Sequence, residues 1–203
     1  MNTTDYLRIL VEEIHSTTIA TIAEDGHPQT RVIDMMLWDE KCVYFLTAKG
    51  KLFYDQLMEQ KYIALSATKD KLSVSLRGKI RNIGAEKLDE IFEKNTYMQQ
   101  IYPGDTRSAL EVFQVYEAEG QYFDISDPSH IVRDSFVIGE MEIKESGYFV
   151  SKGCIGCKKC SQVCPQKCID VSKIPAVIDQ KHCLHCGRCV EACPEKAIKK
   201  LKS

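Results

Sequence analysis

Two copies of one cysteine pattern constrain this 203-residue chain more than any other feature of its sequence. The copies read CIGCKKCSQVCP from Cys154 and CLHCGRCVEACP from Cys183, and a shift of 29 residues superposes them. The same shift matches Ile169 to Ile198, whereas Cys168 falls where the second copy has Ala197. A duplicated unit of this size predicts two equivalent sites.

Nine of the ten cysteines lie between Cys154 and Cys193, and such crowding indicates disulfides or metal. The N-terminal sequence MNTTDYLRILVEEIHSTT has no basic segment leading into an apolar core, and no apolar run approaches the ~20 residues that span a bilayer. We therefore expect a cytoplasmic protein, in a reducing compartment where metal is favoured over disulfides. The tenth cysteine, Cys42, lies in the alternating segment KCVYFLT and is predicted to be a core residue.

Each copy has the spacing C-x2-C-x2-C-x3-C-P, which resembles that of bacterial ferredoxins with two [4Fe-4S] clusters. The resemblance implies that each cluster takes three cysteines from one copy and its fourth from the other. The first predicted ligand set is Cys154, Cys157, Cys160 and Cys193. The second predicted ligand set is Cys183, Cys186, Cys189 and Cys164. Paired zinc sites are the alternative, but zinc usually takes two C-x2-C pairs rather than four cysteines in each run.

Four other residues of this segment have predicted roles. Gly156 and Gly187 are expected to ease the wrapping of the chain and to free amides that point at sulfur. Cys168 is interpreted as a small buried residue packed beside a cluster, with a redox-active or ligand-swapping role as the alternative. His185 is interpreted as a residue that lines a cluster, with a proton-coupled role as the alternative.

The distribution of charge also divides the chain. Residues 146–203 carry 11 Lys and Arg against 4 Asp and Glu, whereas residues 1–145 carry 16 against 25. We therefore expect one domain over residues 1–145 and a ferredoxin domain over residues 146–203. The lysines of the second domain are expected to solvate it, with docking of a redox partner protein as the alternative. The net charge of -2 gives no reason to expect nucleic-acid binding.

Residues 1–145 show the repeated alternation of apolar and polar residues that is typical of short strands. Strands are predicted over residues 18–23, 29–38, 42–47, 61–68, 71–83 and 112–125. Helices are predicted over residues 50–59 and 85–101, the second with Leu88, Ile91, Phe92, Asn95 and Met98 at helical spacing. Closely spaced strands separated by turn signals favour a small closed barrel.

Three segments, GHPQTRVIDMMLW, VYFLTAKGKLFYDQL and LSVSLRGKI, resemble the FMN-binding split barrel of the pyridoxamine 5'-phosphate oxidase superfamily. The resemblance covers about residues 5–140 and is closest to the nitroimidazole-reductase-like branch. It implies a homodimer through the barrel, with FMN at the interface. The expected fold class is mainly β with helices (α+β), as a six-stranded split β-barrel followed by a small ferredoxin-like α+β domain.

By position, the same resemblance implies the residues that contact FMN. The phosphate would be held by Arg31 and Lys51, since a dianion favours a planar cationic fork and a point charge. A helix that begins near Gly50 would offer free amides to the same anion. Thr47, Ala48, Lys49 and Gly50 would line the phosphate and the ring edge, and Val32, Ile33 and Asp34 would run beneath the isoalloxazine. Ser73, five residues before Gly78, lies where the oxidases commonly place a flavin-contacting glutamine. The alternative for Arg31, Lys49 and Lys51 is that they are solvated surface charges.

The two parts together predict an FMN- and iron–sulfur-dependent oxidoreductase that passes electrons between two [4Fe-4S] clusters and FMN, to or from a small organic substrate. The alternative is an electron-transfer module or redox sensor without substrate turnover. Oxidation of pyridoxamine phosphate is disfavoured, because the ferredoxin domain follows the barrel and no Arg-x-His-type terminus is present. No spacing identifies a catalytic acid or base, and His15, His27 and His130 are predicted to be turn or surface residues.

Overall fold

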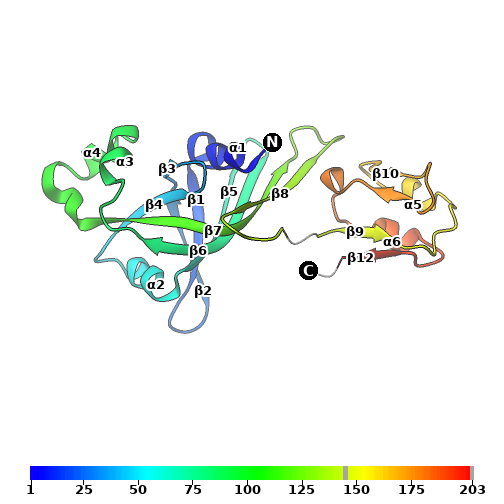
Figure 1. Cartoon of the computed structure of the whole chain (residues 1–203), viewed down its shortest axis with the longest axis horizontal. Coiled ribbons are helices and arrows are strands. Elements are labelled where there is room, and N and C mark those ends of the chain that lie inside the picture. Colours follow the sequence, from blue (N-terminus) through cyan, green and yellow to red (C-terminus); the bar gives the residue numbers. More distant parts are fainter. Residues whose placement is uncertain (144–145, 202–203) are drawn as a thin grey trace. The chain divides into compact units, whose positions relative to one another are not determined.

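A computed structural model describes residues 1–143 and 146–201. The chain divides into two compact units, each of which is described by itself (Figure 1). The barrel unit contains Met1–Tyr122 and Ser135–Glu142, and the cysteine-rich unit contains Phe123–Asp134 and Ile143–Ser203. The predicted domain boundary between residues 145 and 146 stays a prediction, since residues 144–145 lie outside the described residues.

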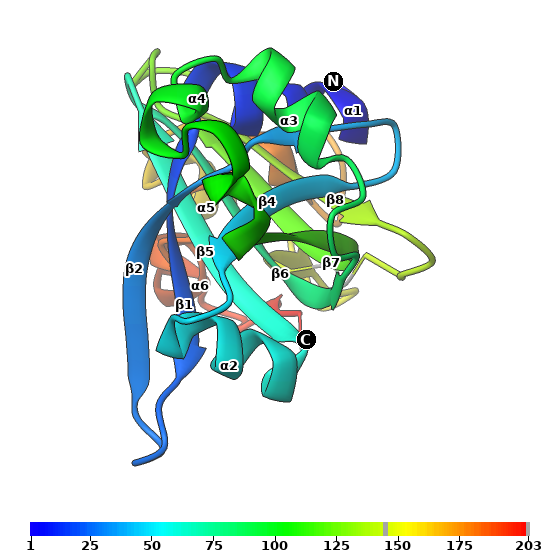
Figure 2. The same cartoon turned by 90° about the vertical axis from the view of Figure 1, so that its left-hand side faces the viewer.

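One curled antiparallel sheet forms the barrel unit (Figure 2). Its strands are β1 (Ser16–Ile22), β2 (Pro28–Asp34), β3 (Leu37–Trp38), β4 (Val43–Ala48), β5 (Tyr62–Lys69), β6 (Leu72–Asn82), β7 (Leu110–Asp124) and β8 (Val132–Ile138). Their order in the sheet is β2-β1-β5-β6-β7-β4-β3, and β8 pairs with β7. The predicted mainly β fold with a split barrel is confirmed, and the sheet has eight strands where the sequence indicated six.

The chain itself joins the two edges of this sheet. The predicted strand over residues 29–38 is two strands, β2 and β3, which lie at opposite ends of the strand order. Between them Met35 and Met36 are buried; the Met35 N–H donates to the His15 carbonyl at 2.9 Å and the Met36 N–H to the Tyr44 carbonyl at 2.8 Å. This corner transfers the chain from its pairing with β1 at one edge of the curled sheet to its pairing with β4 near the other edge.

Helices cover the ends of the barrel. They are α1 (Thr3–Arg8), the π-helical turn η1 (Ile9–Ile14), α2 (Leu52–Gln60), α3 (Leu88–Lys94), α4 (Met98–Ile101) and the 3-10 turn η2 (Gly104–Ala109). Figures 1 and 2 show α2 and the α3–α4 segment at opposite ends of the barrel unit. The predicted helix over residues 85–101 is broken, because Asn95 Nδ2 donates to the carbonyls of Ile91 and Met36, both at 2.9 Å, and ends α3.

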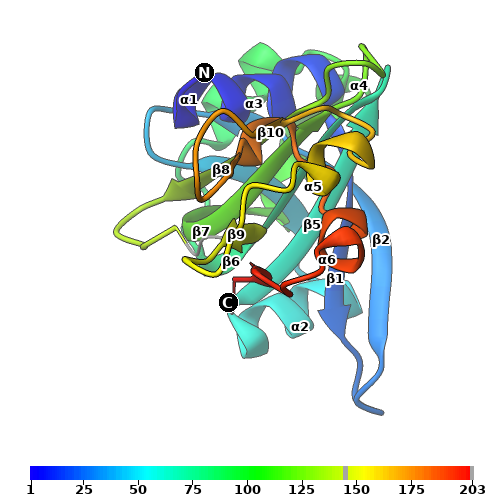
Figure 3. The ribbon, with the colours of Figure 1, turned by 90° about the vertical axis from the view of Figure 1, so that its right-hand side faces the viewer.

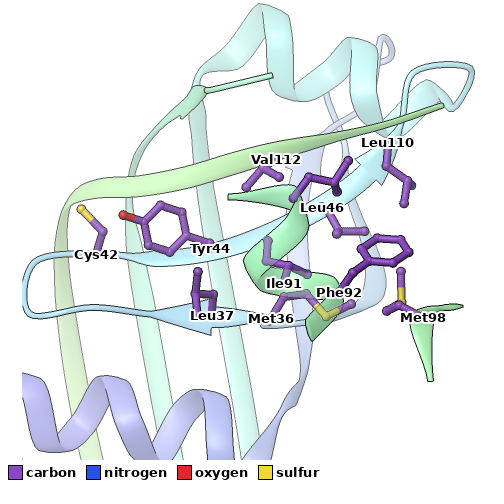
Figure 4. Close-up of a cluster of buried hydrophobic side chains, with 11 residues drawn as sticks. Met36, Leu37, Cys42, Tyr44, Leu46, Ile91, Phe92, Met98, Leu110 and Val112 are labelled. Atoms are coloured by element: carbon purple, nitrogen blue, oxygen red, sulfur yellow. The ribbon is translucent and has the colours of Figure 1, made fainter. Parts of the chain in front are cut away.

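A hydrophobic cluster packs α3 and α4 against β3, β4 and β7 (Figure 4). Leu88, Ile91, Phe92 and Met98 are buried in it, which confirms the predicted apolar face of this segment. Cys42 is also buried there, as predicted, and its Sγ accepts a hydrogen bond from Gln114 Nε2 at 3.0 Å. Strand β4 is thus held between β7 and β3 in the sheet, which positions the residues that follow it.

The cysteine-rich unit is built from short elements that repeat (Figure 3). They are β9 (Tyr148–Val150), α5 (Lys159–Gln162), β10 (Ile169–Asp170), β11 (Val177–Ile178), η3 (Gln180–His182), α6 (Arg188–Ala192) and β12 (Ile198–Lys200). The start of α5 maps onto the start of α6, and that of β10 onto that of β12, by the same shift of 29 residues. Strand β9 pairs with β12 and β10 with β11, around a small core that includes Ile169, Ile178 and Ile198.

Candidate cofactor sites

Two cavities lie in the cysteine-rich unit, and each brings together one of the predicted ligand sets. The first has an empty volume of about 420 Å³, open solvent included. Its walls contain Cys154, Cys157, Cys160 and Cys193. The second has an empty volume of about 340 Å³, open solvent included. Its walls contain Cys164, Cys183, Cys186 and Cys189. Each cavity therefore draws three cysteines from one copy of the repeat and one from the other.

The backbone repeats its unusual conformations as well as its cysteines. Residues in the left-handed region occur at three pairs of positions that are 29 residues apart. These pairs are Gly156 and His185, Lys158 and Gly187, and Lys167 and Lys196. The first copy has its glycine in the first pair, at Gly156, and the second copy has it in the second pair, at Gly187. The backbone conformation is therefore the same in both copies, although the residues differ. Successive turns of this kind direct amide groups inward, as an anionic cluster requires.

Two backbone amides already point at cysteine sulfur. The His185 N–H donates to Cys183 Sγ at 3.4 Å, and the Ala197 N–H donates to Cys193 Sγ at 3.3 Å. Such bonds favour thiolates and stabilise negative charge on a cluster. In the described part of the chain no three His, Cys, Asp or Glu side chains converge on a point that would suit a single metal ion.

Cys168 lies against the second ligand set. Its Sγ is 3.6 Å from Cys164 Sγ and forms a hydrogen bond with Cys183. This bond from Cys168 lowers the pKa of Cys183 to about 6, and the same interaction raises the pKa of Cys168. Cys168 is half-buried in the wall of the cavity, which agrees with the prediction of a small residue packed beside a cluster.

In the barrel unit, Arg31 lies against the first turns of α2. Its Nη1 donates to Thr21 Oγ1 at 2.7 Å and its Nη2 to Gln56 Oε1 at 3.0 Å. The guanidinium carbon is 4.3 Å from the centroid of the Phe53 ring. Partial burial lowers the pKa of Arg31. These hydrogen-bond partners are neutral, so they orient the guanidinium without neutralising its charge.

The segment after β4 leads directly into α2. Ala48 is half-buried, Lys49 and Gly50 are exposed, and Lys51 is the N-cap of the helix, where no side chain caps the amide groups. The Thr47 side chain is buried, and its Oγ1 has no hydrogen-bond partner among the described residues. A buried hydroxyl without a partner and an uncapped helix start both suit a polar ligand.

Lys49 has a different neighbour. Its Nζ is 3.8 Å from Glu111 Oε1, and Glu111 Oε2 also accepts hydrogen bonds from Tyr54 at 2.7 Å and Asn82 at 2.6 Å. The Tyr54 bond is the main cause that lowers the pKa of Glu111. The role of Lys49 as an FMN contact stays a prediction.

The three predicted ring contacts lie at the end of β2. Val32 is 70% exposed, and the Ile33 carbonyl accepts a hydrogen bond from Thr17 Oγ1 at 2.9 Å. Asp34 is held by Ser16 Oγ, which donates to its Oδ1 at 2.6 Å. Ser73 is in β6, where it pairs with Thr68 of β5. The structure thus groups Arg31 with α2 and Asp34 with a second polar cluster.

Two members of that second cluster have no role in the predicted site. The Tyr97 hydroxyl donates to Asp34 Oδ2 at 3.1 Å and lies 3.1 Å from His15 Nε2, which is 3.6 Å from Asp34 Oδ2. Burial, with the nearby Asp34 carboxylate, raises the pKa of Tyr97 to about 12. His15 ends the π-helical turn with a φ of 68°, so its prediction as a turn residue is confirmed. No spacing in the sequence connects these two residues, since Tyr97 reaches the cluster through the break between α3 and α4.

A curled antiparallel sheet and two four-cysteine cavities define a protein that joins a split barrel to an iron–sulfur domain. The family model described as pyridoxamine 5'-phosphate oxidase matches residues 3–124, and the chain belongs to this family. A second model, described as a 4Fe-4S dicluster domain, matches residues 147–194. The two resemblances expected from the sequence are thereby confirmed.

Solved structures agree with the barrel. A NimC/NimA family protein from Clostridium acetobutylicum is 16% identical with a TM-score of 0.57, over 68% of this chain and 95% of that one. A protein related to general stress protein 26 of B. subtilis (pyridoxinephosphate oxidase family), also from C. acetobutylicum, is 18% identical with a TM-score of 0.50, over 66% and 94%. Identities this low show the fold alone. A comparison with curated proteins finds no match. Among the described residues, none of the helices has the length and apolar character needed to cross a membrane.

Proposed function

We propose that the chain is an oxidoreductase that binds FMN in its barrel unit and two [4Fe-4S] clusters in its cysteine-rich unit, and that passes electrons between them to or from a small organic substrate. The observation that carries the proposal is that a chain of the pyridoxamine 5'-phosphate oxidase family also contains two cavities, each lined by a complete four-cysteine set. Bound FMN exchanges one or two electrons and each cluster exchanges one, so together they connect a two-electron substrate to one-electron carriers.

The residues of the cysteine-rich unit suit this role. Cys154, Cys157, Cys160 and Cys193 would hold one cluster, and Cys164, Cys183, Cys186 and Cys189 the other. The amides of His185 and Ala197 would stabilise the negative charge of the thiolates.

The residues of the barrel unit suit an anionic flavin. Arg31 has an oriented and uncompensated guanidinium against α2, whose uncapped first turn begins after Lys51. The cationic side chains of Arg31 and Lys51 and the free amides of the helix start are donors of the kind that a phosphate group favours. The buried hydroxyl of Thr47, near the end of β4, has no partner among the described residues and would gain one from a bound ligand. The Asp34–Tyr97–His15 cluster can hold a proton near the end of β2.

A homodimer through the barrel forms part of the proposal. Strand β2 is an edge of the sheet and is largely exposed along its length. Large apolar side chains of β1, β2, β5 and α2 are also exposed: Ile22, Val32, Leu52, Met58 and Tyr62. An edge strand and apolar side chains of this kind favour association with a second copy. Light scattering of the protein purified from the cytoplasm should show a species of twice the chain mass.

The test is anaerobic purification followed by three measurements: flavin content, iron content, and the rate at which reduced clusters reduce FMN in a stopped-flow experiment. We expect one FMN and two four-iron clusters per chain. Electron transfer from the clusters to FMN should be faster than the reaction between a separate flavoprotein and a separate ferredoxin after mixing. Clusters without flavin would leave only the electron-transfer module, and zinc in place of iron would contradict the proposal.

A further inference from the structure

The two cysteine cavities have different cationic surroundings, although their loops repeat. The cations that line the first cavity, Lys158 and Lys173, are exposed side chains. The second cavity has an exposed cation in its wall, Arg188. In addition Arg133, which comes from outside the repeat and is not part of that wall, lies close enough to Cys183 for its charge to act on the thiolate. Charges in water are screened, whereas a charge shielded from water acts strongly on its neighbours.

Backbone groups of the hairpin between β7 and β8 are hydrogen-bonded to residues at and beside the second cavity. The Ile131 N–H donates to Gln166 Oε1 at 3.1 Å, and His182 Nδ1 donates to the Ile131 carbonyl at 2.7 Å. Gln166 lines the second cavity and His182 directly precedes Cys183. Ile131 itself is 3% exposed. Residues two apart along an extended chain point to the same side, so Ile131 fixes the direction of Arg133.

The Arg133 side chain is partly withdrawn from water. Its Nε is buried and has no hydrogen-bond partner among the described residues, and its guanidinium carbon is 4.6 Å from the centroid of the Phe123 ring. Burial lowers the pKa of Arg133, while attraction to Cys183 acts in the opposite direction. An arginine remains protonated in such a setting.

We propose that Arg133 raises the reduction potential of the cluster held by Cys164, Cys183, Cys186 and Cys189 above that of the other cluster. The inference rests on the proposed function, because it requires both clusters to be bound. Reduction adds one electron, and therefore one negative charge, to the cluster. A fixed guanidinium in partly dry surroundings stabilises the more negative state, whereas the exposed Lys158 and Lys173 at the first cavity do so weakly.

This assignment gives the two clusters an order. The cluster beside Arg133 is the preferred resting place of the first electron, and the other cluster is filled second. A chain with two loops of the same cysteine spacing thereby obtains two unequal one-electron sites through one residue contributed by the β7–β8 hairpin.

The test is a redox titration of the anaerobic holoprotein, followed by EPR, in wild type and in Arg133→Met. Methionine keeps apolar contact with Phe123 and removes the charge. We expect two reduction potentials in wild type. In the variant the reduction equilibrium of the higher-potential cluster should become about tenfold less favourable, which lowers its potential by about 59 mV for one electron. The lower potential should stay unchanged. Arg188→Gln is the matched control, because it removes the same charge from an exposed position at the same cavity.

Each outcome separates the inference from the proposed function. Both clusters present with the higher potential unchanged in Arg133→Met, or an equal fall in Arg188→Gln, would overturn the inference alone. A wild-type protein without iron would overturn the proposed function instead. If Arg133→Met loses iron, Arg133→Lys provides the test, since it keeps the charge in a form that reaches water. Its higher potential should fall below that of wild type, and an unchanged value in a fully loaded protein would refute the role of the partly buried Arg133 side chain.

Discussion

The sulfur atoms of Cys164 and Cys168 lie 3.6 Å apart in the wall of one cavity, yet only the first belongs to the repeated pattern. The position of Cys168 in the other copy is taken by Ala197. A thiol at this distance can donate a hydrogen bond to a ligand thiolate without being a ligand itself. Substitution of each cysteine in turn therefore distinguishes a thiol that binds the cluster from one that only lies beside it.

Replacing Cys164 with alanine should remove the cluster of the second cavity, because a [4Fe-4S] cluster needs four thiolates. The iron content of the anaerobic protein should fall to about half of the wild-type value. Cys168→Ala should retain full iron, since the second repeat already has alanine at this place. Full iron in Cys164→Ala, or loss of iron in Cys168→Ala alone, would show that Cys168 ligates instead.

Arg31→Ala should weaken FMN binding by about tenfold to 100-fold, because a charge-assisted hydrogen bond contributes about 1.5–3 kcal/mol. The barrel should stay folded, since Thr21 still donates to Gln56 at 2.7 Å when the arginine is removed. Fluorescence titration of the flavin-free protein measures the affinity. Arg77→Ala is the control, as Arg77 is exposed and paired with Glu119. Equal affinities in the two variants would refute the phosphate role of Arg31.

The sequence predicted the parts of the fold that depend on local patterns. Alternation placed β1, β4, β5, β6 and β7 to within about two residues, because each has one face in the barrel. The cysteine repeat predicted two equivalent sites and the two groups of four thiols that line the cavities. Spacing was sufficient there, since the same turn conformations recur in both copies.

Features that depend on long-range contacts were not predicted. The break at Met35 follows from the chain crossing between the two edges of the curled sheet, and nothing in the segment QTRVIDMMLW marks it. The first helix was missed although Asn2 and Asp5 form a capping box, a signal that could have identified it. Tyr97 and Arg133 act on groups far away in the sequence, so only the folded chain reveals them.

Gly78→Ala should destabilise the barrel by about 1–3 kcal/mol, because a Cβ at this position of β6 would overlap Ala118 and the Glu117 carbonyl of β7. Gly50→Ala is the matched control, since a Cβ there meets nothing within 4 Å. Chemical unfolding of flavin-free protein, followed by the fluorescence of Trp38, compares the two. Trp38 is the single tryptophan of the chain and lies in the barrel. Equal midpoints would mean that β6 and β7 do not approach so closely.

Glu111→Gln should make the stability of the barrel less sensitive to acid. Hydrogen bonds from Tyr54 and Asn82 lower the pKa of Glu111 in the folded chain. The ionised carboxylate therefore stabilises the barrel at any pH above the ordinary pKa of a glutamate. That contribution is lost as the pH falls from about 5 through the lowered pKa. The variant should be less stable by about 1 kcal/mol at pH 7, and the difference should shrink toward pH 3. Trp38 fluorescence in urea at each pH measures it, and a constant difference would contradict the prediction.

Removal of iron should unfold the cysteine-rich unit and leave the barrel folded. The elements of this unit are two to five residues long, and its core combines a few aliphatic side chains with the cysteines themselves. A segment of this size has too little apolar surface to fold without its metal, so cluster binding supplies the folding free energy. The barrel has its own buried core, which includes Phe45, Phe113 and Ile63.

Anaerobic chelation followed by hydrogen exchange measures both units in one sample. Amides of residues 147–201 should lose their protection together as iron leaves, whereas those of β5 and β6 should keep theirs. The unfolding midpoint reported by Trp38 should move by less than it does in Gly78→Ala, because chelation leaves the barrel contacts in place. Slow exchange in both cysteine loops after complete loss of iron would mean that the polypeptide alone stabilises this unit. The two cavities would then be preformed, and the metal would add to a fold that already exists.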